Sequence, residues 1–207
     1  PSPEAWARTK THLGMSPDTL VVAYDKQGSV YASRLWWMLK ATGHAKVQVL
    51  DGGLDAWNGP MGTVPRQPKP TQKPVEPMPY VGLVLVDEVV GNLQSQKNKV
   101  IDARANDRFH GQNETLDPVG GHIPGAINHF FKDNLSATAF KPAEQLFKEF
   151  VELLGPTKPS DVIHQCGSGV TACHNLLAME LAGLKGSRLY AGSWSEWCAD
   201  TKRPIEL

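Results

Sequence analysis

The sequence predicts an α/β fold with two units, each a mostly parallel sheet flanked by helices, and the first unit is incomplete in this chain. Two observations lead to this prediction. Short apolar runs typical of buried strands alternate with stretches whose apolar residues recur at helical spacing. The same order of apolar runs and glycines also occurs twice, about 140 residues apart, as in chains built from copies of one structural unit.

The first unit is predicted over residues 1–60. A helix is expected near its start because Pro3 suits a first helical turn, and a later helix is expected to stop at Gly43. Apolar runs between polar residues predict two strands. The expected elements are a helix over 3–12, a strand over 20–24, a helix over 31–41, a strand over 47–50 and a helix start over 54–57.

A proline-rich segment separates the two units. Residues 60–79 hold seven prolines, with Lys, Gln and Thr between them. Such a composition does not build a core and is typical of an extended, fairly stiff tether. We therefore place a linker over 61–79 and the second unit over 80–207.

The clearest helix of the second unit spans 143–154. Its apolar residues follow the i, i+3, i+4, i+7 pattern, and Gly155-Pro156 ends the run. The other expected elements are a helix over 84–93, a strand over 100–104, a polar loop over 106–121, a strand over 162–164, a helix from about 171, a strand over 188–190 and a helical segment over 194–197.

The repeat pairs Asp25 of the first copy with Cys166 of the second, and Gly28 with Gly169. A carboxylate cannot act as a nucleophile in sulfur chemistry, so the first copy is expected to be structural. The first copy also has only 24 residues before Asp25. Roughly 60 residues of the unit are therefore expected to be absent, as in a fragment or a processed form.

Residues 162–172 carry the chemistry that we expect to be central. Cys166 opens a short loop that contains Gly167 and Gly169, and a helix begins near Thr171. Glycines allow the backbone to turn N–H groups inward, and the first helical turn adds unpaired N–H groups and the positive end of its dipole. Such a cradle stabilises an anion, so we expect Cys166 to be an ionised, nucleophilic sulfur.

A cysteine at the end of a strand is more often a small apolar packing residue. The strand–Cys–Gly-x-Gly–helix context favours catalysis over packing for Cys166. The catalytic interpretation requires that the sulfur be reachable from solvent and react faster than an ordinary thiol at neutral pH.

These features resemble the rhodanese superfamily. The resemblance is carried by the two-copy layout, by Cys-Gly-Ser-Gly-Val-Thr-Ala at 166–172, by Gly-His-Ile-Pro-Gly-Ala at 121–126 and by Gly-Ser-Trp at 192–194. More narrowly, the chain is similar to tandem-domain thiosulfate and 3-mercaptopyruvate sulfurtransferases over essentially its whole length. The resemblance implies two rhodanese-like domains, an inactive first one and an active second one that forms a persulfide on Cys166.

The resemblance also implies roles for particular residues. Arg108 matches a family arginine that holds the substrate carboxylate, and a Ser168 hydroxyl would help proton transfer at the pyruvate enolate. Arg104 is expected either to bind substrate or to form an internal ion pair with Asp102. The implied site comprises Cys166 and Ser168 as catalytic residues, Gly167, Gly169, Val170 and Thr171 as the loop cradle, and Arg108 and Arg104 as substrate-binding residues.

The donor is expected to be 3-mercaptopyruvate or thiosulfate. Gly167 and Ser168 replace the basic residues that thiosulfate-preferring members carry, which slightly favours mercaptopyruvate. Mercaptopyruvate enzymes often place a second arginine within 112–118, and this chain has no basic residue there. Thiosulfate therefore remains an alternative. The expected acceptors are cyanide, a small thiol or a reduced thioredoxin-like protein.

Other reactive side chains have less demanding interpretations. His122 is expected to be a structural hydrogen-bonding residue, and His164 a core residue with a smaller chance of supporting the site. Cys173 is expected to pack in the core. Cys198, near the C-terminus, is expected to be exposed, with a regulatory disulfide as a minor alternative.

Two rival functions remain. A cysteine phosphatase also uses a thiolate in a strand–loop–helix cradle, but it needs an arginine six residues after the cysteine, where this chain has Ala172. The second rival is a rhodanese-like module that relays sulfur or binds a partner without multiple turnover.

Composition excludes several other classes. Lys plus Arg and Asp plus Glu both number 21, so no overall charge favours nucleic acid or an anionic membrane. No apolar run approaches the ~20 residues of a membrane span. Three cysteines without a C-x-x-C pair argue against a disulfide framework and against a zinc site. We expect no cofactor, no metal and a reducing, cytoplasmic location.

Overall fold

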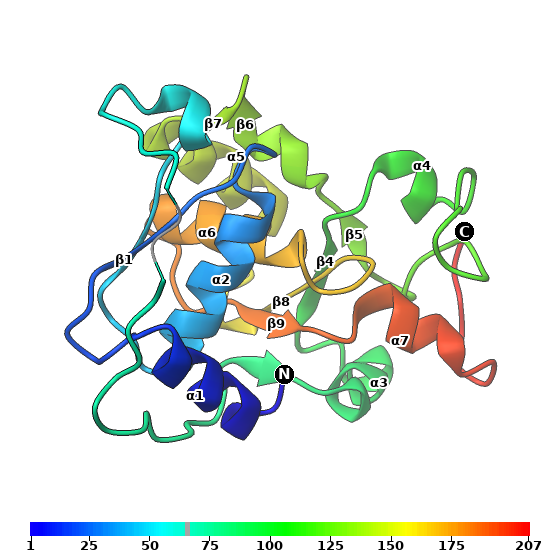
Figure 1. Ribbon diagram of the computed structural model, residues 1–207. Helices are drawn as coiled ribbons and strands as arrows, with labels where there is room; N and C mark the ends of the chain where they lie inside the picture. The colour runs from blue at the N-terminus through cyan, green and yellow to red at the C-terminus, as the bar shows by residue number, and fades with distance from the viewer. Residues whose placement is uncertain (65–66) are drawn as a thin grey trace. The chain divides into compact units, whose positions relative to one another are not determined.

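The computed structural model describes residues 1–64 and 67–207 (Figure 1). These residues form two compact units, Pro1–Val81 and Gly82–Leu207. Each unit has its own parallel sheet. The α/β class predicted from the alternation of strands and helices is therefore confirmed.

The second unit is organised around a five-stranded sheet with the strand order β3-β9-β8-β4-β5, and all its pairings are parallel. Asp102 ends β4 and is paired in register with Gln165, which ends β8. Cys166 therefore leaves the sheet at its carboxyl edge, where open α/β sheets bind their ligands. The strands are β3 (Leu83–Val84), β4 (Lys99–Asp102), β5 (Ile127–Asn128), β8 (Val162–Gln165) and β9 (Arg188–Tyr190).

Helices cover both faces of this sheet (Figure 1). α6 packs on β8 and contacts α5 on one face. On the other face, Val89 of α3 and Trp194 and Trp197 of α7 form a buried cluster with Val100 and Ile163 of the sheet. The helices are α3 (Val86–Ser95), α4 (Asn106–Phe109), α5 (Ala143–Leu154), α6 (Ala172–Leu181) and α7 (Ser193–Ala199), and the unit also holds the short hairpin of β6 (Leu135–Ser136) and β7 (Ala139–Phe140) and the 3₁₀ turns Phe131–Asn134 and Pro159–Asp161.

The first unit has a smaller sheet in the part of the chain that the structure describes. β1 and β2 pair in parallel, and α2 contacts both strands. Leu20, Val22 and Tyr24 are exposed along β1 and at its ends, at 58%, 47% and 57%. Its elements are α1 (Pro3–His12), β1 (Val21–Ala23), α2 (Val30–Ala41), β2 (Val47–Val49) and the 3₁₀ turn Gly53–Ala56.

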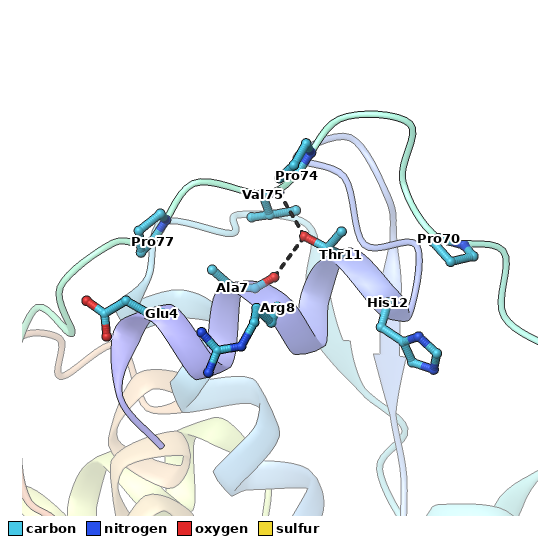
Figure 2. Close-up of a pocket in the computed structure, with 9 residues that line it drawn as sticks. All are labelled: Glu4, Ala7, Arg8, Thr11, His12, Pro70, Pro74, Val75 and Pro77. Carbon is cyan, nitrogen blue, oxygen red and sulfur yellow. Dashed lines mark hydrogen bonds between the residues drawn. The ribbon is translucent and has the colours of Figure 1, made fainter.

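Part of the proline-rich segment packs on the first unit. The backbone N–H of Thr71 donates to the carbonyl of Thr11 in α1, and the N–H of Val75 donates to the Thr11 hydroxyl. Figure 2 shows the groove of about 500 Å³ that α1 and this segment line. At its described residues the linker predicted over 61–79 contains no helix or strand, and residues 65–66 of that prediction lie outside the described residues.

Most element bounds agree with the sequence predictions. The helices over 3–12 and 143–154 and the strand over 188–190 have the predicted bounds. The helix predicted over 84–93 spans 86–95 instead, because Val84 belongs to β3 and Leu85 is extended, with φ −96° and ψ 161°. The predicted polar loop over 106–121 contains α4, and the helix start predicted over 54–57 is a 3₁₀ turn.

Candidate active site

Cys166 follows β8 directly, and neighbouring segments fix its backbone. Its N–H donates to the Ser193 hydroxyl at 3.1 Å, and its carbonyl accepts from the Trp194 N–H at 2.9 Å. Ser193 in turn donates its hydroxyl proton to the Tyr190 carbonyl. These contacts tie the cysteine to the start of α7, which begins at the carboxyl end of the neighbouring strand β9.

Cys166 is 2% exposed, which is less exposure than the catalytic interpretation calls for. The residues on either side of it differ: Gln165 is fully buried, whereas Gly167 is half-buried and Ser168 is exposed. A donor therefore has to approach the sulfur from the side of Gly167 and Ser168.

The loop after Cys166 requires glycine at position 169. Gly169 has a φ of +74°, and a Cβ added there would lie 2.5 Å from the Ala191 carbonyl oxygen. Over residues 1–64 and 67–207, no side chain or carbonyl accepts a hydrogen bond from the backbone N–H groups of Gly167, Ser168 or Val170. Backbone donors that lack an acceptor are suited to an anion.

The corresponding loop of the first unit contains its own anion. Asp25 lies between β1 and α2, and its carboxylate accepts four backbone N–H hydrogen bonds at 2.8–2.9 Å. The donors are Gln27, Ser29, Tyr31 and Ala32. A loop of this strand–loop–helix kind therefore directs its N–H groups toward the side chain of its first residue.

Arg108 lies next to the cysteine loop. A Cβ added at Gly167 would be 3.8 Å from Arg108 Nη2, 3.9 Å from Nη1 and 4.0 Å from Asp117 Oδ2. The Nε and Nη2 atoms of Arg108 both donate to Glu114, at 2.8–3.0 Å, and Nη2 also reaches Asp117 at 3.4 Å. The structure thus brings Arg108 and the cysteine loop together, as the sequence predicts, but with two carboxylates on the guanidinium.

Arg104 is held inside the protein. Its side chain is 1% exposed and forms a bidentate pair with Asp102, with Nη2 also donating to the Gly121 carbonyl at 2.7 Å. The guanidinium lies 4.8 Å from the ring centroid of Trp194. This arrangement matches the internal ion pair; among the described residues Arg104 Nη1 has no hydrogen-bond partner and lies 3.5 Å from Glu114 Oε2.

The remaining loop hydroxyls make few contacts. Ser168 is exposed, and Thr171 precedes α6 without a side-chain capping bond.

Cys173 is fully buried in α6, and its thiol donates to the Gly169 carbonyl. Cys198 is 5% exposed, so the prediction that it is exposed is wrong; α7 turns it into the core. Burial, and then the charge of Asp117, raise the pKa of the Cys198 thiol.

The two histidines of interest have structural surroundings. His122 stacks on Phe109 with centroids 3.7 Å apart, and its Nδ1 lies 2.9 Å from the Phe109 carbonyl. His164 faces Met179 of α6, and burial together with the charge of His129 lowers its pKa to about 3. His164 is therefore neutral and belongs to the core.

Sequence reasoning missed three residues of this region. Ser193 fixes the Cys166 N–H, and it does so with a φ of +56°, a region unusual for a residue other than glycine. Glu114 and Asp117 surround Arg108. The Gly-Ser-Trp motif pointed to Ser193, but no local pattern showed that the acidic residues fold back onto the arginine.

No cluster of three or more His, Cys, Asp or Glu side chains suited to a metal occurs in the described part of the chain. Over the same residues, none of the helices is both long enough and apolar enough to cross a bilayer.

Comparison with known proteins identifies the family. The rhodanese-like domain model matches residues 2–60 and 85–200. The chain belongs to the rhodanese-like family. Among curated rhodanese relatives, it is 42% identical to the probable 3-mercaptopyruvate sulfurtransferase of Pseudomonas aeruginosa, over 99% of this chain and 74% of that protein.

Two further rhodanese relatives are similar over most of the chain. The human 3-mercaptopyruvate sulfurtransferase is 36% identical over 95% of this chain and 68% of its own length. The mouse thiosulfate sulfurtransferase is 37% identical over 90% of this chain and 65% of its own length. These relatives support an enzyme of the sulfurtransferase type.

Solved structures show the same fold. The anaerobic ergothioneine biosynthesis enzyme of Chlorobium limicola, in complex with trimethyl histidine, matches with a TM-score of 0.88 at 22% identity. The match covers all of this chain and 55% of that one, so this chain spans about half the length of the solved protein. The likeness concerns the rhodanese fold alone.

Proposed function

We propose that this chain transfers a sulfane sulfur from 3-mercaptopyruvate or thiosulfate to a thiophilic acceptor through a persulfide on Cys166. The observation that carries the proposal is the open set of N–H donors at Gly167, Ser168 and Val170 beside that cysteine. The Asp25 loop supports it, because the same local geometry there holds a carboxylate with four N–H bonds. A persulfide anion on Cys166 would occupy an equivalent place.

The loading step conserves sulfur and electrons. The Cys166 thiolate attacks the donor sulfur, and a new S–S bond forms. With 3-mercaptopyruvate the C–S bond breaks and its electron pair stays on carbon, so that a pyruvate enolate leaves and takes up a proton. With thiosulfate the S–S bond breaks and sulfite leaves with the pair. An acceptor then attacks the outer sulfur and returns Cys166 to the thiolate, which is two-step covalent catalysis.

Arg108 would bind the carboxylate of the donor. Nε and Nη2 are occupied by Glu114 and Asp117, whereas Nη1 has no hydrogen-bond partner among the described residues and lies 3.9 Å from the position that a Cβ of Gly167 would take. A charge-assisted bond from Nη1 would orient mercaptopyruvate with its sulfur toward the loop. Ser168, which is exposed on the same loop, would supply the proton that the enolate takes up. Thr171 and the glycines would shape the cradle.

Mercaptopyruvate is slightly favoured as donor by the Gly-Ser sequence at 167–168 and by the Pseudomonas aeruginosa relative. The proposed acceptors are a small thiol, cyanide or a reduced thioredoxin-like protein. A reducing compartment such as the cytoplasm would keep the thiol reduced, and none of the three cysteines takes part in a disulfide in the structure. The two matched segments support two copies of one unit, of which only the second carries the cysteine.

Sulfur loading tests the proposal. The chain is mixed with either donor, and the mass of the Cys166 peptide is measured before and after addition of a thiol. A gain of one sulfur that the thiol removes over many turnovers supports the proposal. A gain without multiple turnover supports a relay instead, and no gain with either donor contradicts both.

Removing Arg108 should weaken mercaptopyruvate use more than thiosulfate use. Arg108→Ala is expected to lower kcat/KM for mercaptopyruvate by an amount that corresponds to ~1.5–3 kcal/mol of lost transition-state stabilisation, which is the typical contribution of a hydrogen bond to a charged group. Arg188→Ala, which removes an arginine paired with Glu88 at the other end of β9, is the matched control. An unchanged KM for mercaptopyruvate would reject Arg108 as the carboxylate clamp.

A further inference from the structure

Glu114 is the nearest counter-ion of Arg108, and it also lies 3.5 Å from Arg104 Nη1. Its carboxylate accepts from Nε and Nη2 of Arg108 and from the backbone N–H groups of Leu116 and Asp117, and its side chain is 4% exposed. Burial opposes ionisation of Glu114, but these hydrogen bonds outweigh it and lower its pKa. Glu114 is therefore a permanent, fully bonded counter-ion of the arginine.

Asp117 adds a second negative charge beside Arg108, which already has Glu114 as its counter-ion. Its Oδ1 accepts from the Ser195 hydroxyl at 2.6 Å, whereas Oδ2 has a single contact among the described residues, 3.4 Å from Arg108 Nη2. Burial and then the charge of Asp117 raise the pKa of the Cys198 thiol, and the charge of Arg104 acts in the opposite direction. Two guanidinium groups, Arg104 and Arg108, meet three carboxylates, Asp102, Glu114 and Asp117, which leaves one negative charge in excess at this place.

The excess charge lies beside the loop that carries the nucleophile. Asp117 Oδ2 and Arg108 Nη1 lie at 4.0 Å and 3.9 Å from the position that a Cβ of Gly167 would take. Glycine leaves that space open. A small molecule that reaches Cys166 past Gly167 would meet a cation and an anion side by side.

We propose that Asp117 forms a subsite for the ammonium group of an α-amino thiol, so that zwitterionic thiols are the preferred sulfur acceptors. This inference rests on the proposed function of Cys166. A thiol such as cysteine carries its ammonium and carboxylate on one carbon, and these groups match Asp117 Oδ2 and Arg108 Nη1. A dianion such as thiosulfate has no partner for Asp117 and is repelled by it.

The step itself needs no oxidant or reductant. The acceptor thiol loses its proton, and its thiolate attacks the outer sulfur of the Cys166 persulfide. The new S–S bond joins the acceptor to that sulfur, and the old S–S bond breaks with its electron pair on Cys166 Sγ. The acceptor leaves as a persulfide. Asp117 takes no part in bond making and acts only on the choice and orientation of the acceptor.

Four thiols separate the contributions of the two charges. Persulfide-loaded chain is mixed with cysteine, which has both groups, cysteamine, which has only the ammonium, 3-mercaptopropionate, which has only the carboxylate, or 2-mercaptoethanol, which has neither. The rate constant of sulfur removal is measured for each thiol and divided by that for 2-mercaptoethanol. The comparison of variants then cancels differences in intrinsic thiol reactivity.

Asp117→Asn should lower the normalised rate constants for cysteine and cysteamine on the order of tenfold, the worth of one charge-assisted hydrogen bond. The value for 3-mercaptopropionate should stay or rise, and Asp117→Glu should keep the wild-type order. Asp161→Asn is the matched control, since it removes a carboxylate at the opposite end of β8, roughly 16 Å away at the rise of a strand.

An equal change for all four thiols in Asp117→Asn would overturn the inference and leave the persulfide mechanism standing. The wild-type chain supplies a second readout that needs no variant: the preference for cysteamine over 2-mercaptoethanol should fall as salt is raised. A preference that does not change with salt contradicts the inference. A wild-type chain that takes up no sulfur overturns the proposed function itself.

Discussion

In the loop after β1 the carboxylate of Asp25 accepts four backbone N–H bonds. In the loop after β8 a cysteine stands at the corresponding position, and the N–H groups of Gly167, Ser168 and Val170 have no acceptor in the part of the chain that the structure describes. The first loop is complete in itself. The backbone N–H donors of the second loop would gain an acceptor only if an anion were present on or near Cys166. The first loop uses its N–H groups for stability, and under the proposed function the second loop uses them for chemistry.

The loops also differ in how their ends are fixed. In the first unit Gly53, with a φ of +63°, lets the chain pass so close to the Asp25 carbonyl that an added Cβ would clash at 2.0 Å. In the second unit the corresponding residue is Ser193, with a similar φ of +56°. The serine accepts an unfavourable backbone conformation, and its hydroxyl binds the Cys166 N–H. Backbone strain at the second loop accompanies precise placement of the cysteine.

The largest effect on stability is expected from removing the Asp25 carboxylate from the first loop. Asp25→Ala leaves four N–H groups without their acceptor, and water replaces the carboxylate only in part, so the first unit should lose ~2–3 kcal/mol of stability. Hydrogen exchange over β1 and α2 measures the loss. Asp18→Ala, which removes an exposed carboxylate paired with Lys46, is the control and should have little effect.

A carboxylate at position 166 should make the second loop resemble the Asp25 loop of the first unit. Cys166→Asp places a carboxylate next to the open N–H groups and is expected to stabilise the second unit by about 1–2 kcal/mol while abolishing sulfur uptake. Denaturant unfolding compares it with Cys166→Ser, which also abolishes uptake but adds no charge. Equal stability of the two variants would show that the N–H groups do not converge on the side chain.

Ser193→Ala tests the placement of the cysteine. Loss of the hydroxyl leaves the Cys166 N–H without its acceptor and should reduce the rate of persulfide formation about fivefold, from roughly 1 kcal/mol for a neutral hydrogen bond. Ser195→Ala, which removes the hydroxyl that binds Asp117, should affect acceptor choice more than loading. A loading rate unaffected by Ser193→Ala would contradict the positioning role.

The smallest effect concerns acid stability. The folded pKa of Glu114 is below its usual value, so its ionised form stabilises the fold above the unfolded pKa, and this contribution is lost as the pH falls through the folded pKa. Glu114→Gln should therefore flatten the decline of stability below about pH 4.5. Unfolding curves at pH 7 and at pH 3.5 measure it. A parallel decline in both proteins would show that the Arg108–Glu114 pair does not contribute.

Most regular elements and the strand–loop–helix arrangement around Cys166 were predictable from the sequence. The apolar period of 143–154 and the Cys-Gly-Ser-Gly motif are local signals, and the structure places both where these signals predict. The helix predicted from Val84 failed at its start because Val84-Leu85-Val86 is a continuous apolar run, and only pairing with β9 makes its first part a strand. Local patterns do not contain that pairing.

Contacts between distant residues were not predictable. The ion pair of Arg104 with Asp102 was one of the two expected alternatives, whereas no local pattern predicted the carboxylates of Glu114 and Asp117 on Arg108. The acidic partners of Arg108 come from a loop whose path depends on the whole unit. Cys198 likewise lies near the C-terminus, but α7 carries it into the core.

The reactivity of Cys166 tests the account most directly, because the residue is 2% exposed and its predicted role requires an accessible, ionised sulfur. Iodoacetamide is added at neutral pH, and the alkylation rates of Cys166, Cys173 and Cys198 are measured from their peptides. The account predicts that Cys166 is modified first and faster than free glutathione. Alkylation of Cys166 at or below the rate of glutathione would contradict it.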